Sequence, residues 1–180
     1  PDRHVYRWDG SSWTPLPGTL SGSVHALQVF GDKLIVGGAF ATIDADTMNS
    51  IAAWDGDRWS PLGSGLACVQ HPCIYPKGIV RSLATFGESL VVGGEFERAG
   101  GTPARGIALC NGRWLDVGGV EGEEGYPEDV DALGTWNGKL VAGGNFVKAG
   151  DATAMGIAAY DGTKWMALSK PGFSGLDDAA

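Results

Sequence analysis

The chain has few of the residues on which catalytic and metal sites usually depend. It contains only 3 histidines and 3 cysteines in 180 residues. It carries no recognisable Ser/His/Asp set, phosphate-binding glycine loop or metal-protease motif. We therefore expect no enzyme activity from this segment and no cofactor.

Basic residues and long apolar runs are also scarce. The 13 Lys and Arg are outnumbered by 21 Asp and Glu, which gives a formal net charge of −8. This balance argues against nucleic acid or an anionic membrane as a partner, because both attract clustered cations. No apolar run approaches the roughly 20 residues of a membrane-spanning helix. The first residue is Pro1 and not Met, so we expect a processed form or an excised fragment.

The cysteines favour an oxidising compartment. Cys68 and Cys73 lie close together in "CVQHPC", where a disulfide would staple a loop-like stretch. Two unpaired thiols are the alternative. A zinc site is a further alternative, because His71 lies between the cysteines, but no second Cys/His pair has the required spacing. Cys110 takes a position that is aromatic in sister repeats, which predicts a packed thiol.

Glycine and a repeated phrase dominate what is present. The 30 glycines are roughly double the usual share of about 7%. A turn-like phrase recurs four times, as "WDGSSW" (8–13), "WDGDRW" (54–59), "LCNGRW" (109–114) and "YDGTKW" (160–165). It belongs to longer units at 24–66, 80–120 and 130–172, with half a unit at 4–18. A period of about 50 residues indicates a propeller, solenoid or array.

Each unit divides into four short strands. In the first unit we expect strands at Val24–Phe30, Lys33–Phe40, Ser50–Asp55 and Arg58–Leu62. Gly-Asp, Gly-Glu, Asn-Gly and Asp-Gly dipeptides join the strands in pairs and favour tight turns with positive φ. Two hairpins in series make a four-stranded antiparallel meander, which is one propeller blade. The predicted fold is all-β, with three complete blades and an N-terminal half blade.

Glycine pairs and aromatic residues recur at fixed places in the units. The pairs 37–38, 93–94 and 143–144 end apolar strands, where backbones can approach closely. We expect Phe40, Phe96 and Phe146 to fill the gaps between blades. We expect Trp59, Trp114 and Trp165 to clamp each outer hairpin onto the next blade, with the indole N–H near water. Metal or ligand binding by the turn aspartates is the competing interpretation, and Asn111 at one of those positions weakens it.

The phrases "VGGAF…AAWDGDRW" and "AGGNF…AAYDGTKW" resemble the kelch repeat, over nearly the whole chain. The turn resembles most the surface-exposed kelch-like propellers, including cortical polarity markers, although the second copy reads "LCNG" instead. The resemblance implies a propeller scaffold that is used mainly for binding. Some relatives are galactose-oxidase-type enzymes with copper held by Tyr and His, a set that is not apparent here.

Long connections predict where a binding face would lie. The blade-to-blade connections 17–23, 63–79 and 118–129 vary in length and share one face with the loops between strands two and three. The candidate binding residues on that face are His71, Tyr75, Lys77, Glu123, Glu124, Tyr126 and Asp129. They are alternatively solvated connectors without a particular role. Asp44 and Asp46 are a weak calcium candidate, because the sister repeats lack the second carboxylate.

Three and a half blades are fewer than the four to eight of a closed ring. Further blades of a longer chain, a second copy, or head-to-tail packing into a filament would each complete it. We expect an extracellular or cell-surface structural or adhesive module that binds other copies, further blades, or a protein or glycan ligand. The alternative is a fragment of a secreted galactose-oxidase-type or glycan-lyase-type enzyme whose catalytic residues lie outside this segment.

Overall fold

The computed structural model describes residues 3–69, 77–123 and 128–168, and their regular secondary structure is entirely β. The prediction of an all-β chain is therefore confirmed for this part of the protein. Within it, no helix is long and apolar enough to cross a membrane.

The described residues form three four-stranded antiparallel sheets, each with its strands side by side in chain order. Sheet 1 contains β3 (Ser23–Phe30), β4 (Lys33–Ala39), β7 (Ile51–Trp54) and β8 (Trp59–Pro61). Sheet 2 contains β10 (Ile79–Phe86), β11 (Ser89–Glu95), β14 (Ile107–Cys110) and β15 (Trp114–Asp116). Sheet 3 contains β17 (Asp129–Trp136), β18 (Lys139–Asn145), β21 (Ile157–Tyr160) and β22 (Trp165–Ala167). The strands predicted for the first unit agree with sheet 1 to within one residue at each end.

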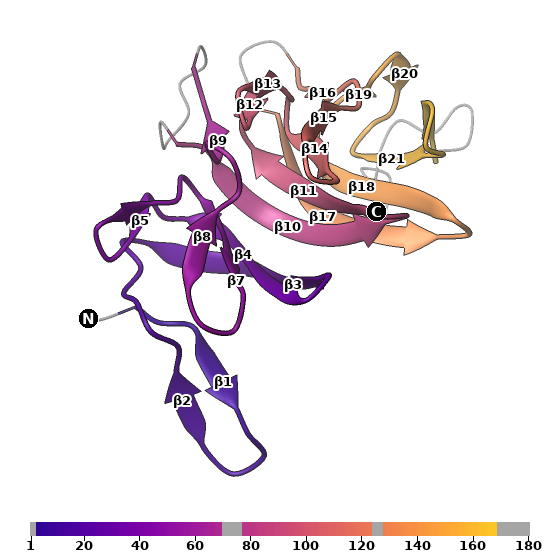
Figure 1. Cartoon of the computed structure of the whole chain (residues 1–180). Helices are drawn as coiled ribbons and strands as arrows, with labels where there is room; N and C mark the ends of the chain where they lie inside the picture. The colour runs from indigo at the N-terminus through magenta and orange to yellow at the C-terminus, as the bar shows by residue number, and fades with distance from the viewer. Residues whose placement is uncertain (1–2, 70–76, 124–127, 169–180) are drawn as a thin grey trace, which may run out of the picture.

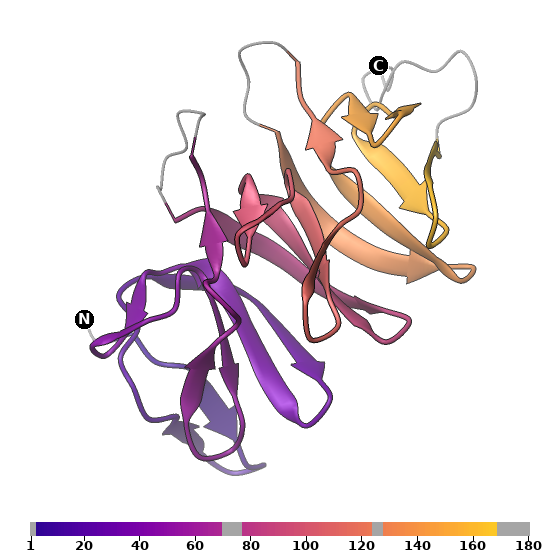
Figure 2. The ribbon, with the colours of Figure 1, turned by 45° about the horizontal axis from the view of Figure 1, so that its top comes forward.

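The three sheets follow one another across the molecule (Figures 1 and 2), and β10 of sheet 2 contacts both β3 and β17. Apolar clusters fill the two interfaces. Ile35 of sheet 1 shares one cluster with Val80 of sheet 2, and Val91 of sheet 2 shares the next with Leu140 of sheet 3. The predicted phenylalanines Phe96 and Phe146 are buried in these two clusters, and Phe40 is buried in a third cluster, with Val5 and Leu20 on the N-terminal side of sheet 1.

In sheets 1 and 2, the first glycine of the pair receives a valine from the following sheet. A Cβ added at Gly37 would overlap the side chain of Val80, and one added at Gly93 would lie 2.8 Å from Val130 Cγ1. A larger side chain at either glycine would therefore push neighbouring sheets apart. We call this contact the glycine seat.

The segments between second and third strands are short hairpins, which the sequence did not predict. They are β5 (Thr42–Ile43) with β6 (Asp46–Thr47), β12 (Arg98–Ala99) with β13 (Thr102–Pro103), and β19 (Lys148–Ala149) with β20 (Ala152–Thr153). The connector strand β9 (Leu66–Ala67) pairs with β12, and β16 (Val120–Glu121) pairs with β19. Each connector thus joins the hairpin of the following unit, and the two kinds of segment lie together as expected.

The tryptophan of each outer strand was placed wrongly by the sequence prediction. Trp59 Nε1 donates a 2.6 Å hydrogen bond to the carbonyl of Pro17, and Trp165 Nε1 donates one of the same length to Val117. Both acceptors lie in the connector before the sheet. The bond of Trp165 is partly buried, where an indole N–H needs a partner, and that of Trp59 is exposed. The tryptophans therefore clamp onto the preceding unit and not the next, and the bonded N–H groups are not left to water.

The repeated Asp-Gly phrase is a hairpin turn, as predicted. The carboxylate of Asp161 accepts hydrogen bonds from the Thr163 hydroxyl and from the backbone N–H groups of Lys164 and Thr163. These bonds lower its pKa to about 2. Asp9 and Asp55 make the corresponding backbone bonds, which also lower their pKa values. The carboxylate closes its own turn in each case, and the following glycine has positive φ.

Candidate functional site: the bulged first strands and the Arg81 cluster

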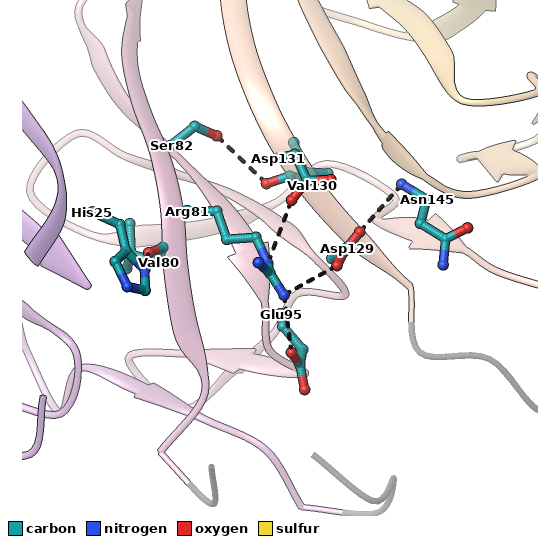
Figure 3. Close-up of polar contacts among 9 residues, drawn as sticks. All are labelled: His25, Val80, Arg81, Ser82, Glu95, Asp129, Val130, Asp131 and Asn145. Atoms are coloured by element: carbon teal, nitrogen blue, oxygen red, sulfur yellow. Dashed lines mark hydrogen bonds and ion pairs between the residues drawn. The ribbon is translucent and has the colours of Figure 1, made fainter. Parts of the chain in front are cut away.

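Each first strand contains a β-bulge at the same place. The register with the second strand shifts between Val24 and Ala26 in sheet 1 and at the corresponding positions of sheets 2 and 3. The extra residues are His25, Arg81 and Asp131. A bulge redirects a side chain out of the regular ladder. Because β3, β10 and β17 adjoin, three polar residues of equivalent position are presented along neighbouring strands (Figure 3).

Arg81 is the centre of an ion cluster between sheets 2 and 3, which Figure 3 shows. Its Nη2 lies 3.3 Å from Asp129 Oδ2 and 3.5 Å from Glu95 Oε2, and its Nε lies 3.5 Å from Asp131 Oδ1. The Glu95 side chain is only 5% exposed, whereas that of Asp131 is 55% exposed. One guanidinium therefore faces three carboxylates, from its own sheet and from the next.

Burial makes Asp129 harder to ionise than a freely solvated aspartate, because it raises the pKa of this carboxyl. Desolvation and the nearby Asp131 raise the pKa of Asp129, while the backbone N–H of Asn145 and the charge of Arg81 act in the opposite direction. The ion pair and the hydrogen bond thus hold a carboxylate that burial alone would favour as the neutral acid.

The first strands are also joined through the carbonyls of the seated valines. His25 Nδ1 lies 3.2 Å from the carbonyl oxygen of Val80, so this nitrogen carries the proton when the contact is a hydrogen bond. The Ser82 hydroxyl donates to the carbonyl of Val130 at 3.5 Å. The polar strip along β3, β10 and β17 therefore cross-links all three sheets beside their apolar interfaces. Chemically, it offers carboxylates and an imidazole at a partly exposed surface.

The predicted binding residues are only partly placed. Lys77 and Glu123 are exposed on the connectors before sheets 2 and 3, while Asp129 belongs to the Arg81 cluster. His71, Tyr75, Glu124 and Tyr126 lie outside the described residues, so a common binding face stays a prediction. Sequence reasoning missed Arg81, Glu95 and Asp131. Aligning "VH", "VR" and "VD" at the start of the first strands would have revealed a polar position there.

Of the two calcium candidate residues, one accepts a hydrogen bond from the backbone and the other is exposed to solvent. Asp44 accepts a 2.9 Å hydrogen bond from the N–H of Thr19 in the preceding connector, and Asp46 is exposed on β6. Among the residues that the structure describes, no group of three or more His, Cys, Asp or Glu could hold a metal ion.

The three cysteines have different outcomes. Cys73 lies outside the described residues, so the Cys68–Cys73 disulfide stays a prediction. Cys110 is a free, half-buried thiol packed against the cluster between sheets 1 and 2, and burial raises its pKa. The prediction of a packed thiol is confirmed.

Comparison with known proteins adds no assignment: no protein-family model matches the chain, and no curated protein matches it.

Proposed function

We propose that this chain is part of a kelch-like β-propeller that acts as a structural or adhesive binding module outside the cell or at its surface. Its four-stranded sheets are the blades, and its main partners are further blades of a longer chain or other copies. A protein or glycan ligand would bind on the connector face. The observation that carries the proposal is the repeated interface between neighbouring sheets, together with a face of sheet 3 that no described residue covers.

Among the described residues, no side chain fills the glycine seat of sheet 3. A Cβ added at Gly143 would come no closer than 3.8 Å to Gly156 O and 4.0 Å to Ala132 Cβ, although the equivalent Gly37 and Gly93 are filled by valines. Trp136 is 57% exposed on this sheet, while Phe30 and Phe86 at the same position pack into clusters. An exposed apolar sheet face of this kind favours association with another sheet.

Self-association through the vacant seat tests the proposal. We expect the molar mass of the purified chain, measured by light scattering after size exclusion, to rise with concentration. Gly143→Val fills the seat, with its Cβ only in ordinary contact with Gly156 O and Ala132 Cβ, and should keep the chain monomeric over the same range.

Thr153→Val is the matched control, because it places the same side chain at an exposed position on β20. It should associate like the unmodified chain, and circular dichroism should show equal β content in all three proteins. A chain that is monomeric at every concentration would contradict assembly of copies through this face. Equal association of Gly143→Val and the unmodified chain would also contradict it.

A further inference from the structure

A small pocket lies where the β12–β13 hairpin meets the connector that carries β9. The strands β13, β12 and β9 form one three-stranded sheet, which Figure 1 shows beside the inner strands of sheet 2. The pocket has a volume of about 160 Å³ and is lined by Val69, Glu97, Arg98, Pro103 and Arg105. It therefore lies on the side of the molecule where the long connections predict a binding face.

The repeat does not require the two arginines of this pocket. The positions of Arg98 and Arg105 carry other residues in the sister units, which are Thr42 and Asn49 in the first and Lys148 and Met155 in the third. The hairpins that carry these residues have the same pairing in all three units. The arginines thus belong to the second unit alone, and the fold gives no reason for them.

Arg98 lacks the ion pair that its counterpart in the third unit forms. There Lys148 Nζ lies 3.1 Å from Glu121 Oε2, on the connector strand opposite. The residue opposite Arg98 on β9 is Ala67, and Arg98 Nη1 donates a 2.9 Å hydrogen bond to the carbonyl of Gly101 instead. A guanidinium has five N–H donors, so this bond leaves most of them available.

Arg105 is exposed, and its guanidinium forms no ion pair or hydrogen bond with a residue that the structure describes. The segment 70–76, which follows Val69 in the sequence, contains no Asp or Glu to neutralise it. The whole chain has a net charge of −8, so most of its surface repels anions. Two arginines and one glutamate make this pocket locally positive, and it favours an anion.

The size and charge of the pocket restrict that anion. At about 30 Å³ for each water molecule, its volume is that of about five waters, enough for one charged group and the atoms next to it. The two positive charges and the negative charge of Glu97 suit a monoanion better than a phosphate dianion. A guanidinium presents a planar fork of donors that matches a carboxylate. A carboxylate is therefore the group that fits best.

Glu97 also distinguishes between carriers of a carboxylate. Its Oε2 accepts a 2.7 Å hydrogen bond from the N–H of Val69, and a carboxylate has about four acceptor sites, so it can accept from a ligand hydroxyl as well. A sugar acid has a hydroxyl near its carboxylate. The acidic side chains of a peptide have none, and would bring a second carboxylate to Glu97 without a donor between them.

We propose that this pocket, the arginine pocket, binds the carboxylate of a uronic acid. Arg98 and Arg105 hold the carboxylate, and Glu97 accepts a hydrogen bond from a neighbouring hydroxyl. Val69, which is 61% exposed, and Pro103 contact the C–H face of the sugar ring. The inference rests on the proposed function, in which the connector face binds a ligand, and it names the chemistry of that ligand.

Titration of the 180-residue chain with methyl galacturonoside, followed by nuclear magnetic resonance of the backbone amides, tests the pocket. We expect saturable shifts of Val69 and of residues 97–105. Methyl galactoside is the matched probe without the carboxylate, and it should cause no saturable shift at these amides.

Two protein variants make the assay specific. Arg105→Met introduces the residue that the third unit has at this position, so the hairpin accepts it, and it should weaken binding at least about tenfold because a charge-assisted hydrogen bond is lost. Lys148→Thr is the matched control. It removes a positive charge from the position equivalent to Arg98 and introduces the residue of the first unit, and it should bind as tightly as the unmodified chain. Circular dichroism checks that both variants are folded.

A linear tetramer of galacturonate distinguishes a free sugar acid from a unit of an acidic glycan. If the tetramer binds no more than about fourfold tighter than the monomer, which is the statistical gain of four equal units, the pocket takes single sugar acids. Tighter binding than this, lost in Arg105→Met, means that a glycan continues over the neighbouring surface. Either result supports the arginine pocket.

Other results would overturn it. They are absence of binding, equal shifts with methyl galactoside, and equal affinity of Arg105→Met and the unmodified chain. Acetylglutamate amide or methyl sulfate binding at least as tightly as methyl galacturonoside would assign the pocket to an acidic peptide or to a sulfate ester instead. If galacturonate fails while the chain still associates through Gly143, the proposed assembly stands without this ligand. If galacturonate binds and association fails, the pocket stands and assembly of copies is wrong.

Discussion

At the scale of single residues, the turn aspartates should make the stability of the chain sensitive to acid. The pKa of Asp161 is about 2 in the folded chain, against an ordinary value of 3.8. A lowered folded-state pKa means that folding favours the ionised form. Its contribution is complete above the ordinary value and is lost as the pH falls towards 2. Asp161→Asn should therefore lose less stability than the unmodified chain between pH 5 and pH 2.5.

Urea unfolding at several pH values measures this difference. Asp151→Asn is the control, because it removes the same charge from an exposed turn, that of the β19–β20 hairpin in the same unit. It should follow the unmodified chain. The role given to Asp161 would be refuted by parallel pH profiles for Asp161→Asn and the unmodified chain.

At the scale of elements, the bond from an outer strand to the preceding connector should contribute measurably to stability. Trp165→Phe removes the N–H that bonds to Val117 and leaves a partly buried carbonyl without its partner. We expect the free energy of unfolding to fall by about 1–3 kcal/mol. Trp13, at the same position of the N-terminal hairpin β1 (Tyr6–Trp8) and β2 (Trp13–Pro15), is 65% exposed, so Trp13→Phe should cost less than about 0.5 kcal/mol.

Denaturant melts of both variants test the clamp. Similar losses for Trp165→Phe and Trp13→Phe would mean that the ring, and not its hydrogen bond to the connector, determines the effect. The same measurement on Trp59→Phe extends the comparison to sheet 1. This variant should behave like Trp165→Phe, because it removes the N–H that donates to Pro17.

The strands of the sheets could be predicted because turn dipeptides and apolar runs are local signals. The dipeptides Gly-Asp, Asn-Gly and Asp-Gly indicated where the hairpin turns lie, and the repeat indicated the order of the strands. The two-residue strands such as β9 and β12 could not be predicted, because their pairing joins segments about 30 residues apart. The direction of the Trp59 clamp and the composition of the ion cluster could not be predicted either. Both depend on which connector or strand packs beside the residue in the folded chain. Nothing in the sequence around Arg81 indicates which carboxylates its guanidinium contacts.

At the scale of the whole molecule, neighbouring sheets pack through separate apolar clusters. The cluster between sheets 1 and 2 and the cluster between sheets 2 and 3 have no described residue in common. Stability should then be close to a sum of terms for single sheets and for adjacent pairs. A chain of residues 1–118, which lacks sheet 3, should keep a cooperative β fold but expose the face of sheet 2 that carries Val91 and Leu109.

One substitution should therefore have opposite effects in the two lengths of chain. In the full chain, Leu109→Glu buries an unpaired charge between sheets 2 and 3, and we expect a loss of about 3–5 kcal/mol in unfolding free energy. In the 1–118 chain the same position faces solvent, so the charge should leave stability nearly unchanged and reduce self-association. Urea unfolding and sedimentation of the four proteins measure both effects. A 1–118 chain without cooperative unfolding would show that the sheets depend on more than their nearest neighbours. Equal destabilisation by Leu109→Glu in both lengths would show that this face is covered from within sheets 1 and 2.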